Sequence, residues 1–119
     1  FLILRPLLDN ATPAASFDCA KSATAVEKTL CSSVALAAYD QSVSQTYKSA
    51  LAYFQTKKGT KTLIDDLKKS QKAWLAKRDT CGTDTACLEE SMRTRVIAIN
   101  DEIGEYTYKK THPKADGGE

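Results

Sequence analysis

The chain has 119 residues and a formal net charge of +2, and 42% of its residues are hydrophobic. This length fits one domain at most, and a charge this close to balance does not by itself indicate a nucleic-acid partner. The sequence contains no RNA-binding motif, zinc-finger spacing or Gly-rich phosphate loop, so we expect no nucleic acid and no cofactor. No apolar run approaches the ~20 residues of a transmembrane helix, so stable membrane insertion is not expected.

Residues 1–16 read as a lead segment before the folded domain. The segment starts with four apolar residues but lacks the initiator Met and charged region of an intact signal peptide. The stretch 11–16, which contains Pro13, is typical of a linker. Cys19 follows no lipobox-like pattern, so we do not expect it to carry a lipid anchor.

A short helix is predicted over residues 25–30. Thr24 and Glu27 fit a capping box, in which a hydroxyl and a carboxylate accept hydrogen bonds from the free N–H groups of the first turn. Cys19 precedes this helix and Cys31 ends it. A disulfide closing that loop would contribute roughly 3 kcal/mol.

Residues 34–57 read as a long helix that begins after the N-cap candidate Ser33 and stops before Gly59. Asp40 interrupts its apolar stripe, where a buried carboxylate needs a partner. The apolar residues at helical spacing are Leu36, Tyr39, Val43, Tyr47, Ala50, Leu51 and Phe54.

Two further helices are predicted over residues 61–79 and 84–108, with Gly82 in a left-handed turn between them. Asp65 lies four residues before Lys69, a spacing that predicts a supportive ion pair. The candidate N-caps are Thr60 or Thr62 for the first helix and Thr83 or Asp84 for the second.

Three long helices with short connections predict an all-α fold, a small antiparallel up-down-up bundle with one short N-terminal helix. We expect the folded domain to cover residues 17–108. Residues 109–119, which contain Pro113 and two glycines, are expected to form a flexible tail.

Four cysteines, Cys19, Cys31, Cys81 and Cys87, indicate two disulfides and an oxidising compartment, although sequence alone allows three pairings. A zinc site is the alternative, but the intervals of eleven and five residues do not match the usual C-x₂₋₄-C pairs. Cys81 and Cys87 flank the Gly82 turn. A structural staple is therefore favoured over a redox pair, which would prefer C-x-x-C spacing.

Asp40 and Arg78 each interrupt an apolar stripe on helices expected to face one another. We predict that they form a charge-assisted ion pair that also involves Tyr47 and fixes helix register. The alternative is a substrate or partner site.

Lysines crowd the helix over 61–79 and the turn before it, whereas the last helix is rich in acidic residues. Such polarity favours two complementary solvated helix faces; the alternative is docking to an acidic partner or cleft. The candidate partner-binding residues are Lys58, Lys61, Lys68 and Lys72.

Catalysis is not expected. The neighbouring carboxylates Asp65 and Asp66 point to different sides of a helix and are poorly placed to flank one bond. The single His lies in the predicted tail, so no Ser or Cys nucleophile has a histidine base.

The segments FDCAKSATAVEKTLC (17–31), LAAYD (36–40) and SQKAWLAKRDTCGTDTACL (70–88) resemble the N-terminal domain of the LprI-type lysozyme inhibitor family. The resemblance covers residues 17–103. It implies an all-helical fold in which Cys19 pairs with Cys31 and Cys81 pairs with Cys87. The family-pattern positions that it marks are Asp40, Trp74, Arg78 and Asp79.

The resemblance also implies an exported bacterial protein, periplasmic or secreted, that binds a lysozyme-type hydrolase and blocks it by occlusion. Ser33-Val34 departs from the acidic residue and proline that often follow the second family cysteine. Two other roles remain open. One is a periplasmic immunity or adaptor protein for a specific toxin, and the other is an envelope packing module that works as an oligomer.

Overall fold

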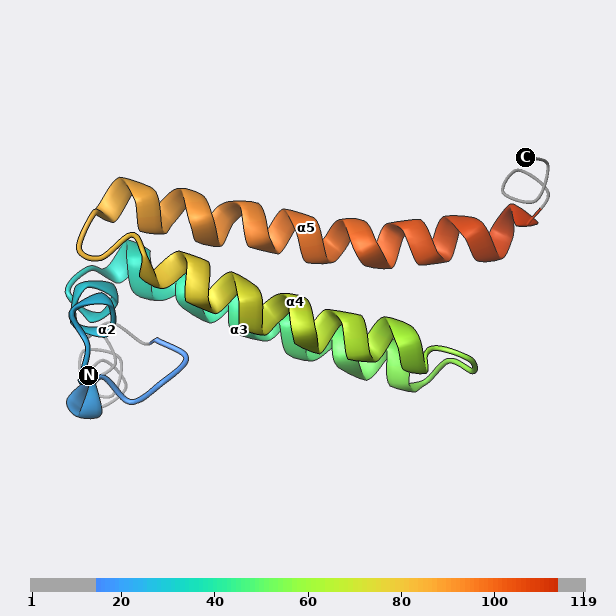
Figure 1. Ribbon diagram of the computed structural model, residues 1–119, viewed down its shortest axis with the longest axis horizontal. Coiled ribbons are helices and arrows are strands. Elements are labelled where there is room, and N and C mark those ends of the chain that lie inside the picture. The colour runs from blue at the N-terminus through green and yellow to red at the C-terminus, as the bar shows by residue number, and fades with distance from the viewer. Residues whose placement is uncertain (1–14, 114–119) are drawn as a thin grey trace, which may run out of the picture.

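Figure 1 shows the computed structural model of the chain, which describes residues 15–113. A short 3-10 helix is followed by four α-helices, and the described residues contain no strand. The elements are η1 (Cys19–Lys21), α2 (Ala25–Cys31), α3 (Val34–Gln55), α4 (Lys61–Asp79) and α5 (Thr85–Thr111). The predicted all-α fold, with three long helices and one short one, is confirmed.

The predicted helix boundaries agree with the structure to within one or two residues, except at the end of α5. This helix continues to Thr111 and therefore includes three residues that the prediction assigned to the tail. Lys109 and Lys110 occupy its last turn, where cations interact favourably with the helix dipole. Lys109 also lies 3.8 Å from Glu105, one turn earlier. The residues beyond 113 lie outside the described part of the chain.

Side-chain caps define the starts of three of the four α-helices. The capping box of Thr24 and Glu27 is present at α2. At α3 the backbone N–H of Leu36 donates to the Ser33 hydroxyl at 3.2 Å. Asp84, rather than Thr83, caps α5 by accepting from the backbone of Cys87. These local signals explain why the boundaries are readable from sequence.

The two interhelical turns each contain a glycine with positive φ, at +72° for Gly59 and +62° for Gly82. This confirms the left-handed turn predicted at Gly82. Thr60 occupies the N-cap position of α4 but makes no side-chain cap. Its buried hydroxyl donates instead to the carbonyl oxygen of Phe54 at 2.6 Å, which ties the start of α4 to the end of α3.

Helix α3 is the centre of the bundle, because it packs on α2, α4 and α5, and most extensively on α5. Its apolar stripe contributes to two separate core clusters. The cluster near α2 contains Val26, Leu30, Leu36, Val43, Leu88 and Met92. The cluster toward the α3–α4 turn contains Ala50, Phe54, Leu67 and Ile99. Asp40 lies on the buried side of α3 as well, and it positions the site described below.

The described helices include none that is long and apolar enough to cross a lipid bilayer.

The capping box predicts a dependence of stability on pH. Hydrogen bonds from the backbone N–H groups of Ala23 and Thr24 lower the pKa of Glu27. When the pKa of a carboxyl is lower in the folded state than in the unfolded state, the folded state gains stability at pH values above the unfolded-state pKa. This stability is lost as the pH falls through the folded-state pKa. We therefore expect the stability of Glu27→Gln to decrease less than that of the wild type as the pH is lowered into the acid range.

Thermal melts from neutral pH into the acid range would measure this effect. Glu89→Gln is a suitable control, because Glu89 is also an exposed carboxylate near a helix start. We expect this control to keep the wild-type acid dependence. Identical profiles for wild type and Glu27→Gln would contradict the assignment.

Candidate functional site

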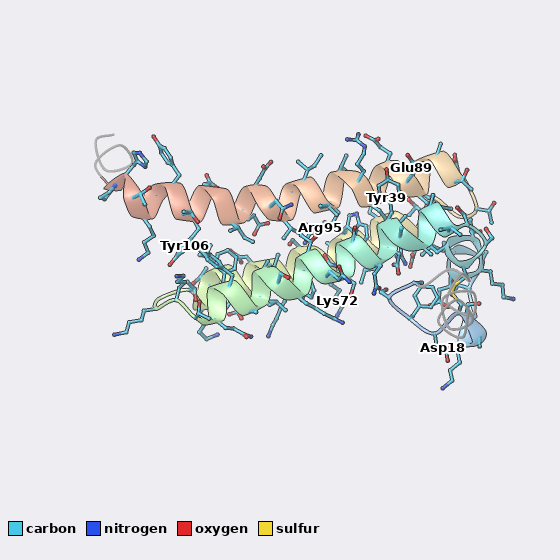
Figure 2. The ribbon with its side chains drawn as sticks, turned by 180° about the vertical axis from the view of Figure 1, so that it is seen from behind. Asp18, Tyr39, Lys72, Glu89, Arg95 and Tyr106 are labelled. Atoms are coloured by element: carbon cyan, nitrogen blue, oxygen red, sulfur yellow. A yellow bond between two sulfur atoms is a disulfide. The ribbon has the colours of Figure 1, made fainter. Side chains whose placement is uncertain are left out.

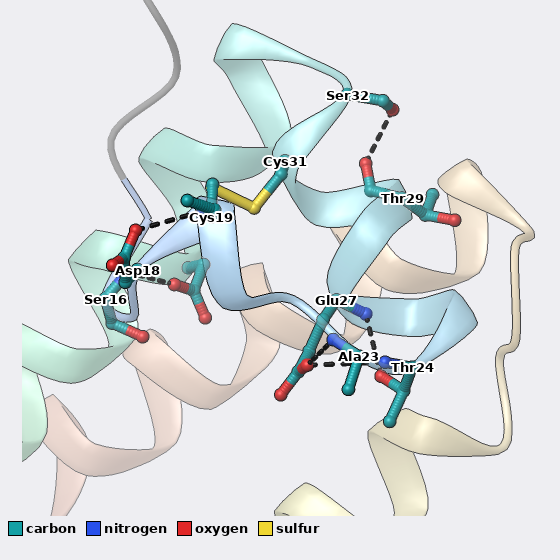
Figure 3. Close-up of a disulfide and its surroundings, with 11 residues drawn as sticks. Ser16, Asp18, Cys19, Ala23, Thr24, Glu27, Thr29, Cys31 and Ser32 are labelled. Atoms are coloured by element: carbon teal, nitrogen blue, oxygen red, sulfur yellow. Dashed lines mark hydrogen bonds between the residues drawn. A yellow bond between two sulfur atoms is a disulfide. The ribbon is translucent and has the colours of Figure 1, made fainter.

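Two disulfides hold the end of the bundle that contains α2. Cys19 pairs with Cys31, which ties η1 to the end of α2, and their Cα atoms are 5.9 Å apart (Figure 3). Cys81 pairs with Cys87 across the turn between α4 and α5, with a Cα separation of 5.6 Å. This is the pairing that the family resemblance implied, and it is confirmed.

Asp40 and Arg78 lie beside each other between α3 and α4. Arg78 Nη1 is 3.6 Å from Asp40 Oδ1, and the two side chains are only 9% and 6% exposed. Asp40 Oδ2 also accepts a hydrogen bond from the backbone N–H of Ser16, rather than from Tyr47. The carboxylate therefore connects the segment before η1 to α3 and, through Arg78, to α4.

Two residues of its own helix, Asp79 and Trp74, also contact Arg78. Its Nε and Nη2 both donate to Asp79 Oδ1, at 3.2 and 2.9 Å. The guanidinium carbon lies 5.5 Å from the centre of the Trp74 ring, within the range of a cation–π contact. Three of the family-pattern positions named above thus belong to one connected cluster on α4, and Asp40 is its partner on α3.

This cluster borders a surface hollow of about 510 Å³, here called the α3–α4 hollow. Its apolar lining includes Phe17, Val43, Tyr47, Trp74 and Leu75. Its cationic lining consists of Lys48, Lys68, Lys72 and Arg78. Two carboxylates also line it, but Asp40 is bound to Arg78 and Ser16, and Glu27 is bound to backbone N–H groups of the α2 cap. Among the described residues, no carboxylate oxygen lies within 4.0 Å of the three lysine ammonium groups.

The four lysines predicted to bind a partner fall into two groups. Lys68 and Lys72 line the α3–α4 hollow, whereas Lys58 and Lys61 lie near the turn between α3 and α4. Lys61 binds Asp65 at 2.9 Å, whereas Lys69, the predicted partner, makes only a longer-range charge interaction with Asp65. Both lysines are four residues from Asp65, and helical spacing alone does not choose between them.

Lys48 lines the α3–α4 hollow but was not among the predicted partner-binding residues. It lies on α3, outside the lysine-rich segment, and becomes part of the hollow because α3 and α4 pack side by side. The only sequence signal was its position immediately after Tyr47, at the edge of the α3 stripe.

The burial of Arg95 was not predicted either, because nothing in the sequence distinguishes it from the exposed charged residues of the last helix. Figure 2 shows it between α5 and the α3–α4 pair. Its Nε donates to Gln71 Oε1 and its Nη2 donates to Ser70 Oγ, both at 2.9 Å. Burial lowers the pKa of the guanidinium. Arg95 thus connects α5 to α4 by hydrogen bonds.

Comparison with known proteins identifies the family. A family profile described as "Lysozyme inhibitor LprI" matches residues 19–111, from the first cysteine to the end of α5. The chain belongs to the LprI family. Proteins named Lipoprotein LprI from Mycobacterium bovis and Mycobacterium tuberculosis are 30% identical to it over 99 residues, which is 79% of this chain. The match covers 46% of their length, so the chain spans about half of these LprI relatives. No solved structure shows significant similarity.

The LprI match contains both disulfides, all four α-helices and the Asp40–Arg78 cluster. Within residues 15–113, no group of three or more His, Cys, Asp or Glu side chains is arranged to hold a metal ion. At the α3–α4 hollow, this LprI domain presents ammonium groups around a lining that includes aromatic and aliphatic side chains.

Proposed function

We propose that this chain is an exported binding protein that inhibits a lysozyme-type cell-wall hydrolase by covering its sugar-binding cleft. The observation that carries the proposal is the LprI match over residues 19–111, which includes nearly the whole helical domain. The family description supplies the class of partner. The charges and apolar walls of the α3–α4 hollow suggest how the domain would recognise such a partner.

Glycoside hydrolases of this type use two carboxyl groups that flank the scissile bond. The ammonium groups of Lys48, Lys68 and Lys72 provide the opposite charge around a hollow with apolar walls. We propose that an acidic edge of the hydrolase cleft faces these lysines, while Trp74 and Leu75 contact apolar groups of the partner. Complementary charge chiefly sets the association rate and the orientation, and the apolar contacts supply binding free energy.

Rigidity favours occlusion. Both disulfides and the buried Asp40–Arg78 pair lie at the end of the molecule that carries the hollow. A surface that is already ordered loses little conformational entropy on binding, so more of the interaction energy contributes to affinity.

The two carboxylates of the α3–α4 hollow, Glu27 and Asp40, are not arranged like the catalytic pair of a glycosidase. A glycosidase needs one carboxyl that is protonated at working pH and one that is ionised. The Glu27 pKa is lowered by its backbone hydrogen bonds, and Asp40 is held as an ion partner of Arg78. Both carboxylates are occupied by contacts within the protein, so we infer that the domain binds rather than catalyses.

We further propose that the protein acts outside the cytoplasm, in the periplasm or after secretion. Two formed disulfides are typical of proteins that reside in oxidising compartments. The name Lipoprotein, carried by the relatives, supports the same placement.

A turbidity assay of cell-wall lysis by several purified lysozymes tests the proposal. We expect added protein to slow lysis in a dose-dependent way. Lys68→Glu/Lys72→Glu should weaken inhibition by about tenfold or more, because two attractive contacts become repulsive. The matched variant Lys58→Glu/Lys61→Glu carries the same change in net charge at the far turn and should have a smaller effect.

Unchanged lysis with every lysozyme tested would contradict inhibition and favour the immunity or adaptor role. Equal weakening by the two double variants would instead show that net charge, rather than the α3–α4 hollow, governs the interaction.

A further inference from the structure

A second hollow lies at the opposite end of α3, between the α3–α4 turn and the end of α5. It has a volume of about 370 Å³ and is called here the tip hollow. Residues at the end of α3 and in the turn after it form one side, and residues 106–111 of α5 form the other. Figure 2 shows Tyr106 near this end of α5, far from Asp18 and the α2 region. The tip hollow shares no residue with the α3–α4 hollow.

The charge of the tip hollow has one sign. Lys57, Lys58 and Lys110 line it, and none of the eight residues within 15–113 that line it is acidic. Glu105, a nearby acid on α5, lies 3.8 Å from Lys109, which is not part of the lining. Such a cationic concavity attracts an anion.

Aromatic rings position two of these lysines. Lys57 Nζ lies 5.1 Å from the centre of the Tyr53 ring, and Lys110 Nζ lies 5.7 Å from that of Tyr106. The two rings pack edge to face with centroids 6.1 Å apart. A cation–π contact uses one side of an ammonium group and leaves its other N–H bonds available to a ligand. The rings therefore orient the ammonium groups around the hollow.

Hydroxyl groups complete the lining. The hydroxyl of Thr56 donates to the carbonyl oxygen of Tyr53 at 2.7 Å, and that of Thr111 donates to the carbonyl oxygen of Tyr108 at 3.1 Å. Thr107 lies 3.1 Å from the Tyr53 hydroxyl and also donates to a backbone carbonyl. A threonine whose proton points to the backbone retains oxygen lone pairs that can accept hydrogen bonds from a ligand. Thr56 has both lone pairs available, whereas the oxygens of Thr107 and Thr111 already contact the Tyr53 hydroxyl and His112 Nδ1 and have one each.

We propose that the tip hollow binds an anionic glycan, in which sugar hydroxyls donate to the threonine oxygens and acidic groups accept from Lys57, Lys58 and Lys110. A lipid surface fits less well. Of the exposed large hydrophobic residues in the described part of the chain, Val34, Leu75, Ile97 and Tyr108, only Tyr108 lies near this end of the molecule. Little apolar surface is therefore available for insertion among acyl chains. This proposal stands apart from the inhibition of a hydrolase, because it uses different residues at the other end of the bundle.

A sedimentation assay with the whole chain and insoluble peptidoglycan, a glycan that carries carboxylates, tests the proposal. We expect the wild-type protein to bind, and Lys57→Gln/Lys110→Gln to bind about tenfold more weakly because two ammonium–anion hydrogen bonds are lost. The control Lys28→Gln/Lys77→Gln removes the same charge from exposed positions outside the tip hollow and should bind like wild type. Circular dichroism of each variant would check that it is folded.

Two further probes separate the alternatives. Chitin, a neutral glycan, should bind more weakly than peptidoglycan, and equal binding would overturn the role of the anion. Vesicles of phosphatidylglycerol should bind weakly, and a preference for them over peptidoglycan would overturn the glycan assignment in favour of a lipid surface. Absence of peptidoglycan binding, or equal loss in both double variants, would also overturn the proposal.

Discussion

Replacing Arg78 with methionine is expected to lower the free energy of unfolding by about 3–5 kcal/mol. The substitution leaves the Asp40 carboxylate, only 6% exposed, without its cationic partner. A buried charge that loses its partner retains the cost of desolvation, while the compensating attraction disappears. Urea unfolding followed by circular dichroism would measure the change.

A double variant distinguishes the buried charge from the loss of packing. In Asp40→Leu/Arg78→Met both charges are absent, so we expect much of the lost stability to return, as for other buried pairs replaced by apolar residues. Lys77→Met is the matched control, because Lys77 is the exposed neighbour of Arg78, and its effect should stay within about 0.5 kcal/mol. A double variant no more stable than Arg78→Met would show that Arg78 acts through packing on Trp74 instead.

Removal of the Cys19–Cys31 disulfide by alanine substitution at both positions is expected to cost about 3 kcal/mol. The bond closes a loop with a sequence separation of 12 residues, and its loss increases the conformational entropy of the unfolded chain. The corresponding change at Cys81 and Cys87, where the separation is 6, should cost about 2 kcal/mol. Denaturant unfolding of both variants under the same conditions would give the two values.

The two disulfide variants should also differ in where the structure opens. Helix α2 packs mainly on η1 and α3, so the loss of the Cys19–Cys31 bond is expected to increase amide exchange at α2, including Val26 and Leu30. The Cys81–Cys87 variant should instead increase exchange at the first turn of α5. Uniform exchange changes along the chain in both variants would mean that the disulfides stabilise only the global fold.

The arrangement of the proposed sites follows from the shape of the bundle. Helix α3 runs from the disulfide-held end, where Asp40 lies beside Arg78, to the tip hollow around Tyr53. The molecule measures 57 Å along its longest axis, so the two ends are positioned to contact separate partners. Lys48 and Lys57 are nine residues apart, about 13 Å at helical rise. We therefore expect charge changes at one hollow to have only a small effect on binding at the other, since surface charges farther apart than the Debye length of about 8–10 Å are largely screened.

Local patterns in the sequence were sufficient for the helices and for their ends, except the end of α5. The Thr24–Glu27 box, the Ser33 cap and the turn at Gly82 involve residues within a few positions of each other, so their geometry depends little on the rest of the fold. The disulfide pairing was different. Four cysteines alone left three pairings open, and only the family resemblance selected the one observed.

Contacts between helices were predictable only where a polar residue interrupted an apolar stripe. Asp40 and Arg78 gave such a signal, and the structure places them 3.6 Å apart. Arg95 also falls on the buried face of α5, but its partners Ser70 and Gln71 are ordinary polar residues on another helix. Nothing in the periodicity of one helix identifies the hydrogen-bond acceptors that a neighbouring helix provides.

Helical periodicity therefore accounts for the number of helices, their order and their apolar faces, because those properties depend on interactions within one turn. The two hollows and their lysine linings were decided by tertiary packing. Lys48 joins Lys68 and Lys72, and Lys57 comes near Lys110, only because of how the helices are rotated and inclined against each other. Those angles depend on how side chains interdigitate across whole interfaces, and no short stretch of the chain contains that information.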